Sequence, residues 1–182
     1  MNEKIPGTNM TYGNGNDAFS VFRPMIEVTG GLSLSQICSI TGLQPSTIQN
    51  WVKRDYIPRP ENKKYFERHL ARILLISALR ECMNIEDIDV LMTTINGDTQ
   101  DESDDIISDS KLYDYFCNSI KNLSSMTLDD KQIEDSIIQT LENEDDDIKA
   151  KLVCALKVMI YAYISGICQK EVNENLKLLQ NL

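Results

Sequence analysis

The sequence is poor in the residue groupings on which most catalytic and metal sites depend. It has a single histidine, His69, and no nucleophile stands near it in the pattern of a Ser-His-Asp triad. Its five cysteines are scattered, without the clusters that bind zinc, and no glycine-rich phosphate loop or calcium-loop pattern is present. We therefore predict that the protein is not an enzyme and has no catalytic residues, no metal site and no cofactor. His69 is expected to be a partly exposed helix residue.

Disulfide, secretion and membrane signals are also missing. An odd number of widely spaced cysteines argues against a disulfide framework and favours a reducing compartment. No apolar run follows Lys4, so no secretory signal is predicted. The run from Leu152 to Cys168 is 17 residues long with Lys157 near its centre, and a mid-membrane lysine costs about 2.5–3.5 kcal/mol. We predict a helix buried in a bundle there, a cytoplasmic protein and no membrane partner.

Positive charge is scarce overall, since the formal net charge is -10, but it is concentrated in one place. The segment 51–80 carries eight basic residues and three acids, whereas 84–147 carries 19 acids and three lysines. Because salt screens charges beyond about 8–10 Å, local charge decides whether a surface can contact phosphates. The basic segment is therefore compatible with nucleic-acid binding. The alternative is that both segments are merely solvated faces.

Where the sequence is periodic, the period is that of a helix, and the fold class predicted is all-α. Ser33 and Gln36 form a capping-box pattern, Gly42 ends the helix that follows, and Pro45 suits the first turn of the next. Further helices are expected over 65–82 and 85–95. Four more are marked by apolar residues within 112–123, 128–141, 148–167 and 172–179, the second of them capped by Thr127 with Leu128 and Ile138 facing inward.

Two short helices joined by a turn containing Gly42 are the helix-turn-helix arrangement, in which the second helix enters the major groove of DNA. The side opposite Ile48 and Trp51 offers hydroxyl and amide groups that can hydrogen-bond to bases, and basic residues follow where phosphates would run. The candidate DNA-binding residues are Ser46, Thr47, Gln49, Asn50, Lys53, Arg54, Arg59, Lys63, Lys64, Tyr65 and Arg68. A plain helical hairpin with a polar outer face would show a similar pattern.

Over residues 32–95 the sequence resembles the DNA-binding domain of MerR-type regulators. The matching pieces are Gly42-Leu43, Ser46-Thr47-Ile48, Ile57-Pro58, Lys64-Tyr65, Leu79-Arg80 and Ile85-Glu86-Asp87-Ile88. It is more similar still to the bacterial family called domain of unknown function 1836, in which the run Ile48-Gln-Asn-Trp-Val-Lys-Arg54 also occurs. The resemblance implies a MerR-like helix-turn-helix with a short wing, followed by a C-terminal helical bundle.

The expected organisation has four parts. Residues 1–29 form a flexible N-terminal arm, 30–96 a MerR-like DNA-binding domain, 97–109 an acidic linker, and 110–182 a helical domain that dimerises or receives a small-molecule or protein effector. The function predicted is a transcriptional regulator that binds double-stranded DNA as a homodimer. The alternative is a protein–protein interaction module on the same fold that does not bind DNA, which the acidic middle and the short wing favour.

Overall fold

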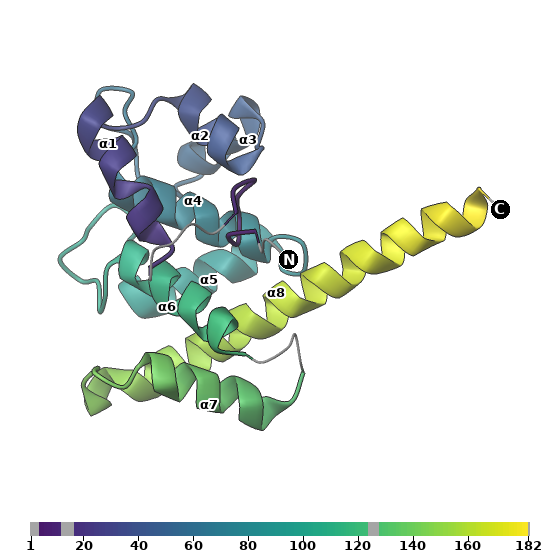
Figure 1. The fold of residues 1–182 in the computed structure, drawn as a ribbon. Helices are drawn as coiled ribbons and strands as arrows, with labels where there is room; N and C mark the ends of the chain where they lie inside the picture. Colours follow the sequence, from purple (N-terminus) through teal and green to yellow (C-terminus); the bar gives the residue numbers. More distant parts are fainter. Residues whose placement is uncertain (1–3, 12–16, 124–127, 182) are drawn as a thin grey trace.

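The computed structural model describes residues 4–11, 17–123 and 128–181, and within these residues the fold is all-helical, without a named strand (Figure 1). The all-α prediction is confirmed. The elements, in chain order, are a 3-10 helix η1 (Phe19–Val21) and the α-helices α1 (Arg23–Thr29), α2 (Leu34–Thr41), α3 (Pro45–Lys53), α4 (Glu67–Leu79), α5 (Ile85–Asn96), α6 (Asp109–Asn122), α7 (Asp130–Thr140) and α8 (Asp146–Gln180).

The bounds of α2 and α3 follow from the signals in the sequence. Ser33 caps α2, because its hydroxyl accepts from the N–H of Gln36 while the Gln36 side chain accepts from the N–H of Ser33. Gly42 ends α2 with φ +74°, and a Cβ there would lie 2.5 Å from Nδ2 of Asn9. Pro45 opens α3, where its missing N–H is not needed. The capping-box, turn and proline predictions are therefore confirmed.

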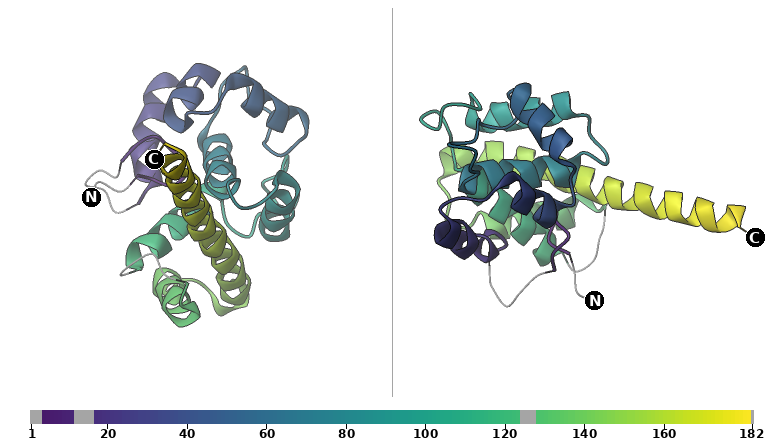
Figure 2. Two further views of the ribbon diagram at one scale, coloured as in Figure 1. Left: turned by 90° about the vertical axis from the view of Figure 1, so that its right-hand side faces the viewer. Right: turned by 90° about the horizontal axis from the view of Figure 1, so that it is seen from above.

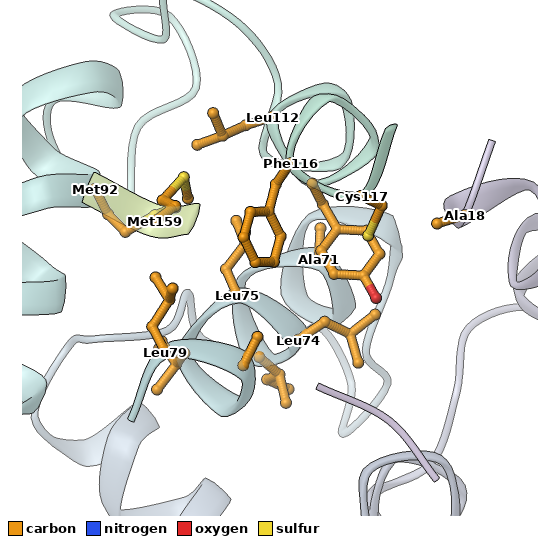
Figure 3. Packing of buried hydrophobic residues seen from close by; sticks show 14 of the residues in the cluster. Ala18, Ala71, Leu74, Leu75, Leu79, Met92, Leu112, Phe116, Cys117 and Met159 are labelled. Atoms are coloured by element: carbon orange, nitrogen blue, oxygen red, sulfur yellow. The ribbon is translucent and has the colours of Figure 1, made fainter. Parts of the chain in front are cut away.

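The helix α4 is the centre of the molecule and contacts α2, α5, α6 and α8. Leu74, Leu75 and Leu79 are fully buried on it, and Phe116 of α6 and Met159 of α8 are buried against them (Figure 3). The buried apolar residues form one cluster that extends from the N-terminal segment to α8. The part that contains α2 and α3 therefore shares a core with the C-terminal helices, although the sequence suggested two domains joined by a linker.

The residues expected to form a flexible N-terminal arm are packed into this core wherever the structure describes them. Ile5 and Phe22 are fully buried, and the backbone N–H of Phe19 donates to Oδ1 of Asp114 at 2.7 Å. Gly7 passes so close to α4 that a Cβ on it would lie 2.2 Å from the carbonyl oxygen of Leu74. The expectation of a flexible arm is wrong for residues 4–11 and 17–29, because their few apolar side chains are spaced to reach the core.

The last two predicted helices are a single helix, α8, whose end projects from the body of the molecule (Figures 1 and 2). By length and composition α8 could cross a membrane, and 44% of its most apolar window is buried inside the protein. Asp146 and Asp147 lie in its first turn, as expected at the positive end of a helix.

The sequence predicted the cap and the inward-facing residues of the neighbouring helix α7, and these predictions are confirmed only in part. Leu128 and Ile138, expected to face inward, are 60% and 48% exposed. Thr127 lies outside the described residues, and Asp129 caps α7 by accepting from the N–H of Gln132. Ile133, Ile137 and Leu141, which the sequence also predicts to face inward, are fully buried. The predicted apolar face is therefore confirmed in part, and the observed cap is Asp129.

Candidate nucleic-acid interface

The outer face of α3 carries a row of unpartnered polar side chains. Ser46, Gln49, Asn50 and Lys53 are exposed and Thr47 is half-buried, whereas Ile48 and Trp51 on the inner side are buried. Among the described residues, none of these five polar side chains makes a hydrogen bond or an ion pair. The polar face predicted from the sequence is therefore present and open to a partner.

The hairpin after α3 presents one further cation at its tip. Glu61 and Lys64 form an antiparallel bridge, with hydrogen bonds of 3.1 and 2.8 Å between their backbones. The two residues between them, Asn62 and Lys63, both have positive φ, as the two-residue turns typical of hairpins require. Lys63 is exposed at this tip.

At the base of the same hairpin, two predicted DNA-binding residues have structural roles instead. Tyr65 is 4% exposed, its backbone pairs with that of Leu32, and burial raises the pKa of its phenol. Nζ of Lys64 donates to the carbonyl oxygens of Thr29 and Gly31, at the end of α1. A buried ring and an engaged ammonium are not free for a phosphate, so the assignment of Tyr65 is wrong and that of Lys64 loses its support.

The remaining arginines of the predicted surface form ion pairs with acidic residues. Arg68, whose side chain is 13% exposed, lies against Glu102 and Asp105 of the acidic segment and donates to the carbonyl oxygen of Asp101. Arg54 pairs with Glu86 of α5 at 2.8 Å, and Arg59 lies 3.5 Å from Asp55. The assignment of Arg68 to a DNA contact is wrong, because this side chain holds the segment 97–109 onto α4.

A buried ionic network lies behind this contact. Arg72 is 1% exposed, donates to the carbonyl oxygen of Tyr56 and to Oγ1 of Thr99, and lies 3.6 Å from Oδ2 of Asp109. Burial, together with the neighbouring carboxylate of Asp109, raises the pKa of Asp105 to about 6. Arg72 is one of the eight basic residues of the segment 51–80, and its strongly apolar neighbours in the run Leu70-Ala-Arg-Ile-Leu-Leu75 were a signal of burial.

His69 belongs to the same interior. It is 4% exposed, so the expectation of a partly exposed residue is wrong. Nδ1 accepts from the N–H of Phe66, which requires Nε2 to carry the proton that faces the carbonyl oxygen of Arg59. Burial lowers the pKa of His69 and keeps it neutral. Its role is to cap α4 and to fix the chain that leads into the hairpin.

In the described part of the chain, no group of three histidine, cysteine, aspartate or glutamate residues is arranged to hold a metal ion. A cavity of about 300 Å³ lies beside Arg68 and His69 and is lined by Glu61, Glu102 and Asp105 among others. It adjoins the ionic network and offers no cluster of cations to a phosphate.

Comparisons with known proteins agree with the family suggested by the sequence. Residues 30–116, a little less than half of the chain, match the model of a family described as Domain of unknown function (DUF1836). A protein of Bacillus subtilis (strain 168) named "Uncharacterized protein YkrK" is 28% identical over 118 residues, which cover 61% of this chain and 51% of that protein. The chain therefore spans about half the length of this curated relative. No solved structure matches the chain, and neither description mentions DNA or MerR-type regulators.

Proposed function

We propose that the chain is a DNA-binding regulator that places the outer face of α3 in the major groove and the hairpin tip against a phosphate backbone. The observation that carries the proposal is the row of exposed, unpartnered side chains Ser46, Gln49, Asn50 and Lys53 on a helix held by a buried inner face. Asparagine and glutamine can bond bidentately to adenine, and serine to any base edge.

The geometry before α3 supports the proposal further. The helices α2 and α3 are joined by three residues beginning with a left-handed glycine, and α4 packs against α2. This is the connection that helix-turn-helix units use. We propose that the unit is MerR-like with a shortened wing, formed by the hairpin around Asn62 and Lys63.

The charge on this surface sets the expected strength of binding. Lys53 and Lys63 have no acidic partner among the described residues, whereas Arg54 and Arg59 each have one. Each neutralised phosphate contributes about -0.9 to the slope of log K against log salt. Two free lysines therefore predict modest affinity and a slope of about -2 per bound copy.

The experiment is fluorescence anisotropy with a random duplex at several salt concentrations. We expect binding at low salt, and the double variant Lys53→Glu with Lys63→Glu should bind at least tenfold more weakly. Lys131→Glu, which adds a carboxylate on the exposed side of α7, is the control and should bind like the parent protein. Equal affinity of the double variant and the control would contradict the proposed surface.

The second candidate is a protein–protein interaction module without DNA binding. It is favoured by the ion pairs of Arg54 and Arg68 with acidic residues, because these carboxylates reduce the positive electrostatic potential beside α3. The same anisotropy series separates the two candidates, since a module of this kind gives no salt-dependent binding to duplex. Where the parent protein does bind duplex, Asn50→Ala tests the outer face of α3, because the DNA-binding proposal requires this variant to alter sequence preference.

A further inference from the structure

The end of α8 is exposed over the whole of its described length. Every residue from Cys168 to Asn181 is exposed, and the main contacts of α8 with other named elements are those with α4, α5, α6 and α7. Figure 1 and the right-hand view of Figure 2 show this end extending away from the body. Isolated helices shorter than about 12–15 residues are marginal in water, so this segment needs a surface to pack against.

A stripe along α8 shows where that surface must lie. The positions 154, 158, 161, 165, 168, 172, 175 and 179 follow one another at alternating spacings of four and three, the repeat of a two-helix coiled coil. We call these residues the outer stripe: Cys154, Val158, Tyr161, Ser165, Cys168, Val172, Asn175 and Leu179. All are exposed except Tyr161, which is half-buried, and Val158, Val172 and Leu179 are 44%, 59% and 67% exposed.

The outer stripe contains no charged residue and runs for about 38 Å at 1.5 Å per residue. It begins on the body of the molecule and continues onto the projecting end, whose lysines, Lys170 and Lys177, balance Glu171 and Glu174. In a chain of net charge -10, this is a long surface where a second acidic copy meets little like-charge repulsion. The nearest carboxylate, Asp130, accepts from the hydroxyl of Tyr161 and is paired with Lys157.

We propose that two copies of the chain pair through this outer stripe, α8 against α8, in antiparallel orientation. A parallel pair would bring together the acidic ends of both bodies, where Asp145, Asp146 and Asp147 begin α8. An antiparallel pair instead lays the neutral end of each copy along the body of the other. The inference supplies the partner for the dimeric regulator and to that extent rests on the proposed function, but the pairing itself needs no DNA.

The antiparallel register follows from the spacing. If the two-fold axis of the dimer passes between Ser165 and Cys168, Leu179 of one copy lies level with Cys154 of the other. Val172 then lies level with Tyr161 of the other copy. Asn175 then faces Val158, and a polar residue at a coiled-coil core position specifies register.

A membrane surface is the competing occupant of an apolar helix. The window of α8 that is apolar enough to span a bilayer is already 44% buried inside the protein. The exposed end beyond it carries four charged residues between 170 and 177, which are costly to insert into a bilayer. A chain of net charge -10 is also repelled by anionic lipid headgroups. These charges favour a second copy of the chain.

The first test measures the mass of the full chain by analytical ultracentrifugation between about 1 and 100 µM. We expect a dimer with a dissociation constant on the order of 10 µM, and Val172→Glu with Leu179→Glu should weaken it at least 100-fold. Asn173→Glu with Asn181→Glu adds the same charges on the other side of α8 and should leave the dimer intact. Because the substituted residues are all exposed on the projecting end, the circular dichroism of the body should be unchanged in both variants.

Several results would overturn the inference. These are a parent protein that is monomeric at 100 µM, a control pair that dissociates as readily as the stripe pair, or a monomer that instead floats with vesicles of mixed neutral and anionic lipid. Normal self-association with no duplex binding would refute only the proposed function, and the reverse pattern would refute only the pairing.

A second test fixes the orientation. In a chain carrying Leu179→Cys, Cys168→Ser and Cys82→Ser, mild oxidation should link Cys154 of one copy to position 179 of the other. Peptide mapping that found links only between equivalent positions, or no link at all, would overturn the antiparallel pairing.

Discussion

At the scale of single residues, the side chain with the largest expected effect on stability is that of Arg72. It is buried between the chain after α3, Thr99 and Asp109, so it ties the predicted DNA-binding part to the C-terminal helices. Removing one partner of a buried ion pair leaves the other charge uncompensated and costs about 3–5 kcal/mol. We expect Arg72→Met to lower the free energy of unfolding by this amount in urea titrations.

Two variants test that explanation. Arg80→Met changes an exposed arginine that follows the same helix and should alter stability by no more than about 0.5 kcal/mol. Adding Asp109→Asn to Arg72→Met should recover part of the loss, because the fully buried carboxylate of Asp109 is then no longer left without its cation, and Asp89, 3.8 Å from Arg72, is partly exposed to solvent. A double variant as unstable as the sum of the two single changes would contradict the pairing.

Asp114 gives a second residue-scale prediction, for the dependence of stability on pH. Burial raises its pKa to about 6, although the Phe19 N–H and Arg23 favour the charged form. The folded chain therefore binds this proton more tightly than the unfolded chain, so the contribution of Asp114 to stability is present below about pH 4 and is lost as pH rises through about 6.

Asp114→Asn removes this titration while its amide oxygen can still accept from Phe19. Relative to the parent protein, we expect the variant to gain about 1 kcal/mol of stability between pH 5 and pH 7, after allowance for partial solvent screening. The measurement is urea unfolding of both proteins at the two pH values. The other groups that titrate in this range, such as His69 and Asp105, are the same in both proteins, so their effects cancel in the comparison. A difference independent of pH would show that Asp114 is ionised throughout.

Residues with strong local preferences were predictable, and those placed by tertiary packing were not. Ser33, Gly42 and Pro45 act through their own backbone geometry, which a short window of sequence contains. The burial of Arg72 and Tyr65 depends on segments distant in the chain, such as Thr99 and Leu32. The polar face of α3 could be predicted because it needs only the helical period, whereas the acidic partners of Arg54 and Arg68 could not.

At the scale of elements, the hairpin tip allows DNA contact and fold to be tested separately. Lys63 has φ +63°, a left-handed conformation that costs a non-glycine residue about 1–2 kcal/mol. Lys63→Gly removes this strain and one cation. Glycine also makes the unfolded chain more flexible, which cancels about 0.4–1 kcal/mol of the stability gained. We expect thermal unfolding at the same or a slightly higher temperature, together with weaker duplex binding and a salt slope reduced by about 1.

Asn62→Gly is the matched control for this variant. It changes the other left-handed residue of the same turn, φ +49°, without changing charge, and should leave duplex binding intact. Weaker binding in both variants would indicate that the shape of the turn, rather than the ammonium of Lys63, makes the contact.

Element lengths were harder to predict than element types. Helical periodicity identified the segments around Leu156 and Leu176 as helical but divided them into two helices, because the sequence between them loses its apolar stripe on the inner side. The structure continues the helix through Ser165 and Gly166, where Gly166 lies close to Glu81. A helix can therefore continue where its inner packing ends, provided that no proline or strong cap stops it.

At the scale of the whole molecule, the single core predicts that the chain unfolds in one step. Trp51, the only tryptophan, lies in α3, whereas most of the helical circular dichroism comes from α4 to α8. Phe116 of α6 is fully buried against the α4 helix that also supports α2. Phe116→Ala should therefore cost about 3–5 kcal/mol and shift the urea midpoints of Trp51 fluorescence and circular dichroism equally.

Val158→Ala, on the exposed side of α8, is the control. At protein concentrations too low for copies to associate, it should shift neither of the two urea midpoints. A Phe116→Ala chain in which only the circular dichroism midpoint moves would show that the part containing α2 and α3 folds on its own, and a fragment ending at residue 96 should then fold as well.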